Sequence, residues 1–188
     1  MRNKSIFLYI VNKNSSMRLL LVLINFFLVA GNALAITWQT ELVDGRHFNY
    51  SSERAIAVDS NGNPHIVYIG SQLYHTHYDG DVWHYEMPIS SFIPTGYHPS
   101  IAIDTSNKVH IIYCGSIDNN YNYGFLYVSN TSGSWETTVI GKTDNISTEG
   151  SLAIDTSGKA HISYYDEEKL KYVTNTTGSW VTTILDNS

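Results

Sequence analysis

Three aspartates along the chain are each followed, six residues later, by a histidine. The pairs are Asp59 and His65, Asp104 and His110, and Asp155 and His161. A histidine beside a carboxylate can serve as a general acid or base in catalysis. A catalytic pair is normally single, whereas this one recurs at one spacing, which is typical of side chains that hydrogen-bond neighbouring strands. We therefore predict structural roles for these residues, assign no catalytic residue and do not favour an enzyme.

A second group of histidines, His75, His77 and His84, lies just behind the first pair. Alternation along a strand places His75 and His77 on one face, where they could bind a metal. Zinc needs three or four such ligands, and the matching places of the later segments hold none. Those places hold Val128 and Asn130, and Val173 and Asn175. We therefore interpret these histidines as a polar strand face and expect neither a metal nor a cofactor.

A longer pattern surrounds each pair and shows that the chain is built from repeats. Each segment contains Ala-Ile/Val-Asp-Ser/Thr, then His-Ile-x-Tyr, and later a glycine-containing turn with a tryptophan. The tryptophans Trp83, Trp135 and Trp180 are expected at equivalent places. The stretches between turns are rich in Val, Ile, Tyr and Thr and show no helical periodicity, so we predict four strands per repeat. In the third repeat we place them near 150–155, 160–165, 169–175 and 180–185. The aspartates lie 45 and 51 residues apart, which is typical of a propeller blade.

The predicted fold class is therefore all-β, a β-propeller-type array of about three four-stranded antiparallel blades. We place the blades roughly at residues 50–89, 97–140 and 148–186, preceded by an outer strand at 37–43, in a domain spanning 36–188. A closed ring needs about 4 to 8 blades. We therefore expect an incomplete propeller, or one completed by further blades in a longer chain or by a homo-oligomer.

Tight turns are predicted directly after the repeated aspartates. Asn61-Gly62 and Ser157-Gly158 supply the positive φ that a short hairpin turn requires, and Asn107 fills that place in the second repeat. The aspartates are well placed to accept the turn amides.

The first 35 residues differ in kind from the rest of the chain. Basic residues without acids precede an apolar run over 19–30, and Ala33-Leu34-Ala35 matches a signal-peptidase site, so we predict a signal peptide over 1–35. Translation would begin at Met1 or Met17. Cleavage would leave no membrane span and seven Lys and Arg against seventeen Asp and Glu, a net charge of −10 that disfavours nucleic acid as a partner. We expect a secreted or cell-surface protein, in which Cys114, the single cysteine, forms no intrachain disulfide.

The third repeat resembles repeats of prokaryotic secreted β-propeller proteins, of the sialidase-like and fucose-lectin-like kinds. The resemblance rests on the run 150–166, which reads GSLAIDTSGKAHISYYD, with Leu170-Lys171-Tyr172 and Gly178-Ser179-Trp180. It implies the architecture more specifically than the biochemistry. The Ser-x-Asp-x-Gly-x-x-Trp turn and the arginine cluster of sialidases are absent from the sequence.

Candidate ligand contacts lie where the repeats differ most. The loop of the second repeat between Cys114 and Phe125 is six residues longer than its counterpart in the third. Its polar and aromatic residues Asp118, Asn119 and Tyr121 suit sugar hydroxyls and apolar sugar faces, and the variable residues Tyr97 and His98 should approach the same rim.

Three functions remain open. We favour a noncatalytic binding module that recognises a glycan or a protein surface. The alternatives are a fragment of a propeller-fold glycoside hydrolase or other hydrolase whose catalytic residues lie in further blades, and a structural spacer of a large surface protein.

Overall fold

The computed structural model describes residues 7–10, 20–23, 40–43, 53–89, 96–118, 122–144 and 149–186. The chain divides into two compact units, 1–47 and 48–188. In the first unit, β1 (Phe7–Ile10) pairs antiparallel with β2 (Leu20–Leu23). The predicted cleavage site at 33–35 and the first part of the outer strand, 37–39, lie outside the described residues, and residues 40–43 carry no strand. Among the described residues, no helix has the length and apolar character needed to cross a membrane.

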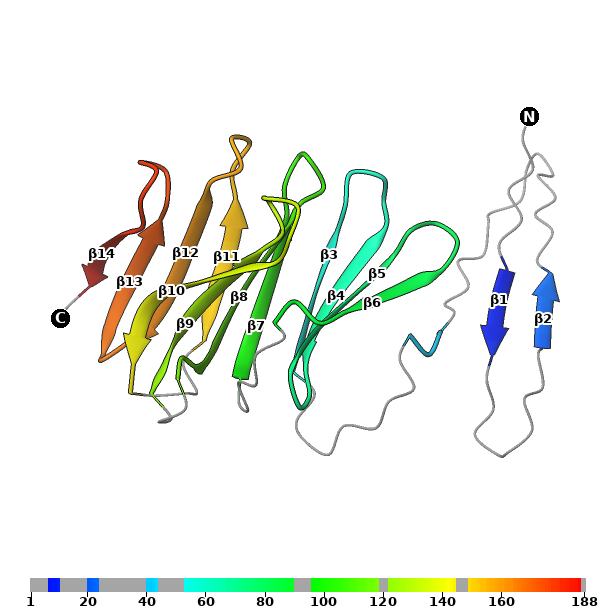
Figure 1. Ribbon diagram of the computed structural model, residues 1–188, viewed down its shortest axis with the longest axis horizontal. Coiled ribbons are helices and arrows are strands. Elements are labelled where there is room, and N and C mark those ends of the chain that lie inside the picture. Colours follow the sequence, from blue (N-terminus) through cyan, green and yellow to red (C-terminus); the bar gives the residue numbers. More distant parts are fainter. Residues whose placement is uncertain are drawn as a thin grey trace, which may run out of the picture. The chain divides into compact units, whose positions relative to one another are not determined.

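The second unit contains three four-stranded antiparallel sheets, which confirm the predicted all-β class with blade-like repeats (Figure 1). In each sheet the strands pair in chain order, and none of the sheets closes on itself. The first sheet consists of β3 (Arg54–Val58), β4 (Pro64–Ile69), β5 (Leu73–Tyr78) and β6 (Trp83–Glu86). The second consists of β7 (Gly96–Ile103), β8 (Val109–Ser116), β9 (Tyr123–Ser129) and β10 (Glu136–Thr143). The third consists of β11 (Gly150–Ile154), β12 (Ala160–Asp166), β13 (Lys169–Thr174) and β14 (Val181–Asp186).

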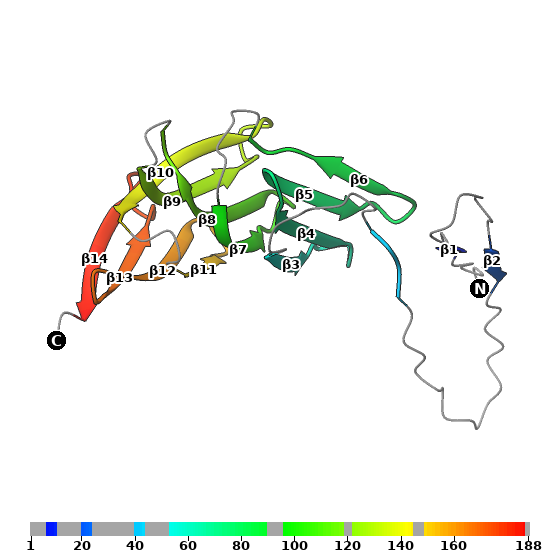
Figure 2. The same ribbon diagram turned by 90° about the horizontal axis from the view of Figure 1, so that it is seen from below.

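The three sheets follow one another in series, and the first strand of the middle sheet, β7, contacts the first strands of both neighbours (Figure 2). Alternate residues of β8 point to opposite faces. Ile111 and Tyr113 enter one apolar cluster with the first sheet, and Ile112 and Cys114 enter a second cluster with the third sheet. The middle sheet is therefore buried on both faces, and Cys114 is a buried core residue.

The turns after the repeated aspartates form as the sequence predicts. In the third sheet, Asp155 Oδ1 accepts the backbone N–H groups of Ser157 and Lys159 at 2.8 and 2.9 Å. Gly158 has a φ of 74°, in the left-handed region that costs glycine least. Asn107, at the same place in the second sheet, has a φ of 58°. These local bonds set the hairpins that connect the first two strands of each sheet.

Candidate functional site

In the second and third sheets, the repeated aspartate and histidine join a tyrosine in a hydrogen-bonded chain. His110 Nε2 lies 3.3 Å from Asp104 Oδ2, and its Nδ1 lies 2.5 Å from the hydroxyl of Tyr127. The third sheet repeats this arrangement at 3.3 and 2.6 Å, with Asp155, His161 and Tyr172. A carboxylate can only accept, so the proton belongs on Nε2 and the tyrosine hydroxyl donates to Nδ1. The recurring triads link the strands within these two sheets.

Burial controls the protonation of the second-sheet triad. The His110 side chain is fully shielded from solvent, and this burial lowers the pKa of its imidazole despite the nearby Asp104 carboxylate. Burial also raises the pKa of Asp104, but hydrogen bonds from the Lys108 amide, from His110 and from the Ser106 amide outweigh it, so the net pKa is lowered. At neutral pH the triad therefore holds a neutral imidazole beside an ionised carboxylate.

The first sheet departs from this pattern. Histidines stand there in place of the tyrosine and of the residue two positions after it, which lies on the same strand face. The strand register pairs His65 with His77, His110 with Ser129, and His161 with Thr174. His75 therefore occupies the place of Tyr127 and Tyr172. The sequence alignment, which matched His75 to Val128 and Val173, was wrong by one residue. A one-residue slip moves every side chain to the opposite face of a sheet, so the valines are not the true counterparts.

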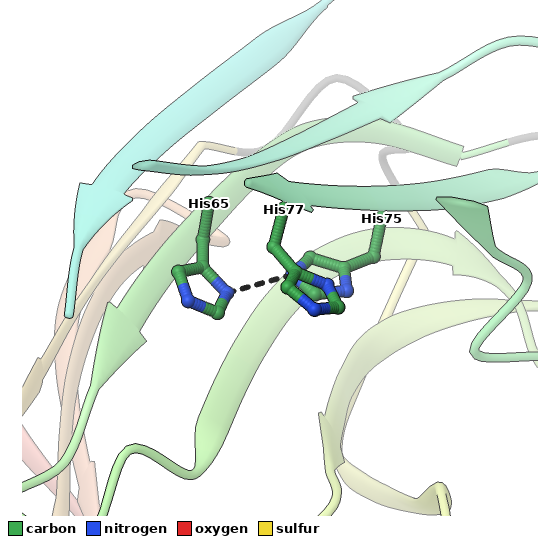
Figure 3. Close-up of side chains that lie close together, drawn as sticks. All are labelled: His65, His75 and His77. Carbon is green, nitrogen blue, oxygen red and sulfur yellow. Dashed lines mark hydrogen bonds between the residues drawn. The ribbon is translucent and has the colours of Figure 1, made fainter. Parts of the chain in front are cut away.

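The structure groups His65, His75 and His77, which are the three residues drawn in Figure 3. One ring nitrogen from each lies within 4.8 Å of the others, and His65 Nδ1 is 3.0 Å from His75 Nε2. The ring planes are nearly parallel, with centroids 5.2 to 5.4 Å apart. The third predicted member, His84, stacks on His77 but directs its Nε2 to Asp79 Oδ2 at 2.6 Å. The sequence had placed His84 in the group in place of His65.

The histidine group lies between the first two sheets and is covered by the second. His75 Nδ1 is 3.1 Å from Glu86 Oε2, and the same oxygen accepts the indole N–H of Trp135 at 3.2 Å. The hydrogen bond from His75 holds the pKa of Glu86 below its usual value. Burial, and then the charges that His75 and His77 would carry, lower the pKa of His65 to about 4. At neutral pH the His65 imidazole is therefore uncharged, and one of its two ring nitrogens carries a lone pair.

A second site lies at the start of the first strands. An open pocket of about 560 Å³ is lined by residues from all three sheets. The lining residues are Glu53, Arg54, His98, Pro99, Glu149 and Gly150. Counting back from the repeated aspartates, these are the same two positions of each repeat. The packing of the first strands therefore brings equivalent residues together in one pocket.

His98 contacts two acidic residues that line the same pocket. Its Nδ1 lies 3.3 Å from Glu53 Oε2 and 3.7 Å from Glu149 Oε1, and its backbone N–H donates to Glu53. The pairing of β7 with β8 shifts between Tyr97 and Ser100, so His98 and Pro99 form a bulge. Proline cannot donate to the strand ladder, which explains the bulge, and His98 adopts a φ of 54° there.

The predicted ligand contacts divide between the pocket and the long loop. His98 lines the pocket. Tyr97 is not among the lining residues, but its ring centroid lies 6.2 Å from that of His98. Asp118 is exposed and closes its own loop by accepting the backbone and side-chain N–H groups of Asn122 at 3.2 and 2.5 Å. Asp118 is not among the residues that line this pocket. Asn119 and Tyr121 lie outside the described residues.

Sequence reasoning missed Glu53 and Glu149. The repeat pattern could have identified them, because each lies six residues before a repeated aspartate, at the same repeat position as His98. The predicted contacts lie where the repeats differ in length, whereas Glu53, His98 and Glu149 occupy one shared repeat position and differ there only in residue type.

Neither a scan of protein-family models nor a search of curated proteins gives a match. Among solved structures, the chain is similar to a fucose lectin from Kordia zhangzhouensis in complex with methyl-fucoside. The TM-score is 0.45 at 14% sequence identity, and the match covers 70% of this chain and 97% of the lectin.

Proposed function

We propose that the chain is an exported, noncatalytic carbohydrate-binding module whose site is the pocket around His98. The observation that carries this proposal is the convergence of the same two repeat positions from three sheets on one open pocket. Glu53 and Glu149 present carboxylates that can accept hydrogen bonds from sugar hydroxyls. The ring of Tyr97 beside His98 offers an aromatic face for the apolar side of a sugar.

The size and shape of the pocket also favour a small polar ligand. Its volume of about 560 Å³ lies within the usual range of small-molecule sites, roughly 300 to 1,000 Å³. It is open rather than deep, and its described lining contains both acidic and basic side chains. A single sugar held there would be bound weakly, and affinity would rise when several chains act together.

A glycan array followed by calorimetry on its best ligand tests this proposal. The double variant Glu53→Gln/Glu149→Gln should lower affinity by at least about tenfold, since each lost charge-assisted bond contributes about 1.5 to 3 kcal/mol. Glu136→Gln is a matched control, because Glu136 is an exposed carboxylate at the far end of the second sheet. Binding that survives in the double variant but is lost after Asp118→Ala would move the site to the long loop. Absence of binding by the folded wild type would favour a protein ligand or the spacer function.

A further inference from the structure

The histidine group of the first sheet offers a different chemistry from the pocket around His98. We propose that His65, His75 and His77 bind one divalent transition-metal ion of the zinc class between the first two sheets. This site is independent of the carbohydrate-binding proposal, since it shares no residue with the pocket.

The facing nitrogens of His65 and His75 provide the main argument. Glu86 can only accept, so the proton of His75 belongs on Nδ1 and its Nε2 carries a lone pair. Asp59 Oδ2 lies 3.9 Å from His65 Nε2 and favours the proton there, which leaves a lone pair on Nδ1. Two lone pairs then face each other at 3.0 Å. They repel unless a proton or a metal ion lies between them.

The dimensions suit a metal ion. Zinc binds imidazole nitrogen at about 2.0 to 2.1 Å, so two nitrogens of a tetrahedral site lie roughly 3.4 Å apart. The 3.0 Å separation is close to this value, and all three nitrogens lie within 4.8 Å of one another, so small ring rotations suffice. Three imidazoles suit zinc, copper, nickel or cobalt, and they leave a position open for water.

The third histidine, His77, and the surrounding carboxylates are also consistent with a metal site. His77 Nδ1 is a buried polar atom without a hydrogen-bond partner among the described residues, and coordination would satisfy it. Glu86 orients His75, and Asp59 lies behind His65, as carboxylates do behind metal-bound histidines. His77 is only half-buried, which gives an ion a path of entry.

The fold itself does not require these histidines. In the other sheets, Tyr127 and Tyr172 occupy the place of His75, and Ser129 and Thr174 occupy the place of His77. In those sheets the tyrosine hydroxyl donates to the repeated histidine and completes its hydrogen bonding. The first sheet lacks that hydroxyl donor and instead carries two further imidazole rings on the same face. A packing role alone does not explain the exchange.

Calorimetric titration of the metal-free full chain with Zn²⁺ at pH 7.5 tests the proposal. The wild type should bind one ion per chain in a saturable manner. The variant His75→Tyr/His77→Thr carries the residues of the third sheet, so it should retain the fold and lose this binding. His77→Thr alone, which alters the least buried ligand, should weaken binding by at least about tenfold. Cobalt(II) should give the visible absorption of a four-coordinate site.

His84→Gln is the matched control, because it removes a neighbouring histidine that stacks on His77 but lies outside the group. It should bind Zn²⁺ with the wild-type stoichiometry and affinity. Circular dichroism and thermal melting of each variant would identify loss of fold. The proposal is overturned if the folded wild type does not bind Zn²⁺ saturably. It is also overturned if folded His75→Tyr/His77→Thr binds as the wild type does, or if His84→Gln abolishes binding.

Discussion

Trp135 of the second sheet donates its indole N–H to Glu86 of the first, across 3.2 Å. Its ring also lies edge-on to His75, with centroids 5.5 Å apart. Trp180 makes the equivalent contact with Tyr127 of the second sheet, at 4.8 Å. Each tryptophan thus packs against the face of the preceding sheet that is turned toward its own sheet. The repeated tryptophan therefore joins neighbouring blades.

Replacing Trp135 should weaken the contact between the first two sheets. A fully buried tryptophan costs roughly 3 to 5 kcal/mol when truncated to alanine, and Trp135 is half-buried, so we expect about 2 to 3 kcal/mol for Trp135→Ala. Urea denaturation measures this loss. Trp135→Phe keeps most of the ring and removes the bond to Glu86, so it should cost less, roughly 1 kcal/mol. Equal, negligible losses for both variants would show that the contact adds no stability.

Stability should fall as the pH drops below about 6.5, the ordinary pKa of histidine. Burial lowers the pKa of His110 in the folded chain, so the unfolded chain binds more protons in this range. The contribution of the neutral His110 ring to the free energy of unfolding is complete above pH 6.5 and is lost as the pH falls toward the folded-state pKa. Chemical denaturation between pH 8 and pH 4 measures the slope.

His110→Gln should make that slope shallower, because the titrating ring is gone. His161→Gln is the control, since His161 occupies the same repeat position but its side chain is 34% exposed on the outer face of the third sheet. If His110→Gln retains the wild-type slope, burial of this ring does not govern the acid response.

The turn between β12 and β13 can be made more stable. Glu167 and Glu168 form its two central residues, with φ values of 51° and 60°. Two positive φ angles define the hairpin turn that Asn-Gly favours. We expect Glu167→Asn/Glu168→Gly to raise the free energy of unfolding by roughly 1 kcal/mol, because it relieves two left-handed residues. Thermal melting would show a higher midpoint, and a lower one would refute the assignment of strain.

The outer face of the third sheet should make the chain self-associate. Tyr165 and Leu170 are 58% and 37% exposed, while their counterparts in the second sheet, Cys114 and Phe125, are buried in the second cluster. A second copy could cover this face as the third sheet covers the second. Sedimentation should show concentration-dependent association that Tyr165→Lys/Leu170→Lys reduces. A monodisperse monomer at high concentration would contradict this expectation.

The sequence by itself determines the strands and their turns. Alternating apolar residues, the turn glycines at 62 and 158 and the aspartates that accept turn amides act within a few residues of one another. Short-range sterics and hydrogen bonds decide these features, so the four strands of each repeat follow from the pattern. For the third repeat, the expected strands at 150–155, 160–165, 169–175 and 180–185 differ from the observed ones by one residue at most at any end.

Only the tertiary structure decides which side chains meet. Register is a property of two strands, and the pairing of β4 with β5 places His65 beside His77 on the face that carries His75. His84 of β6 also pairs with His77, but its Nε2 lies against Asp79 instead of in the group. The packing of separate sheets likewise brings Glu53 and Glu149 to His98, although they lie 45 and 51 residues from it along the chain. Such contacts depend on how whole sheets bury their apolar faces, which no local pattern specifies.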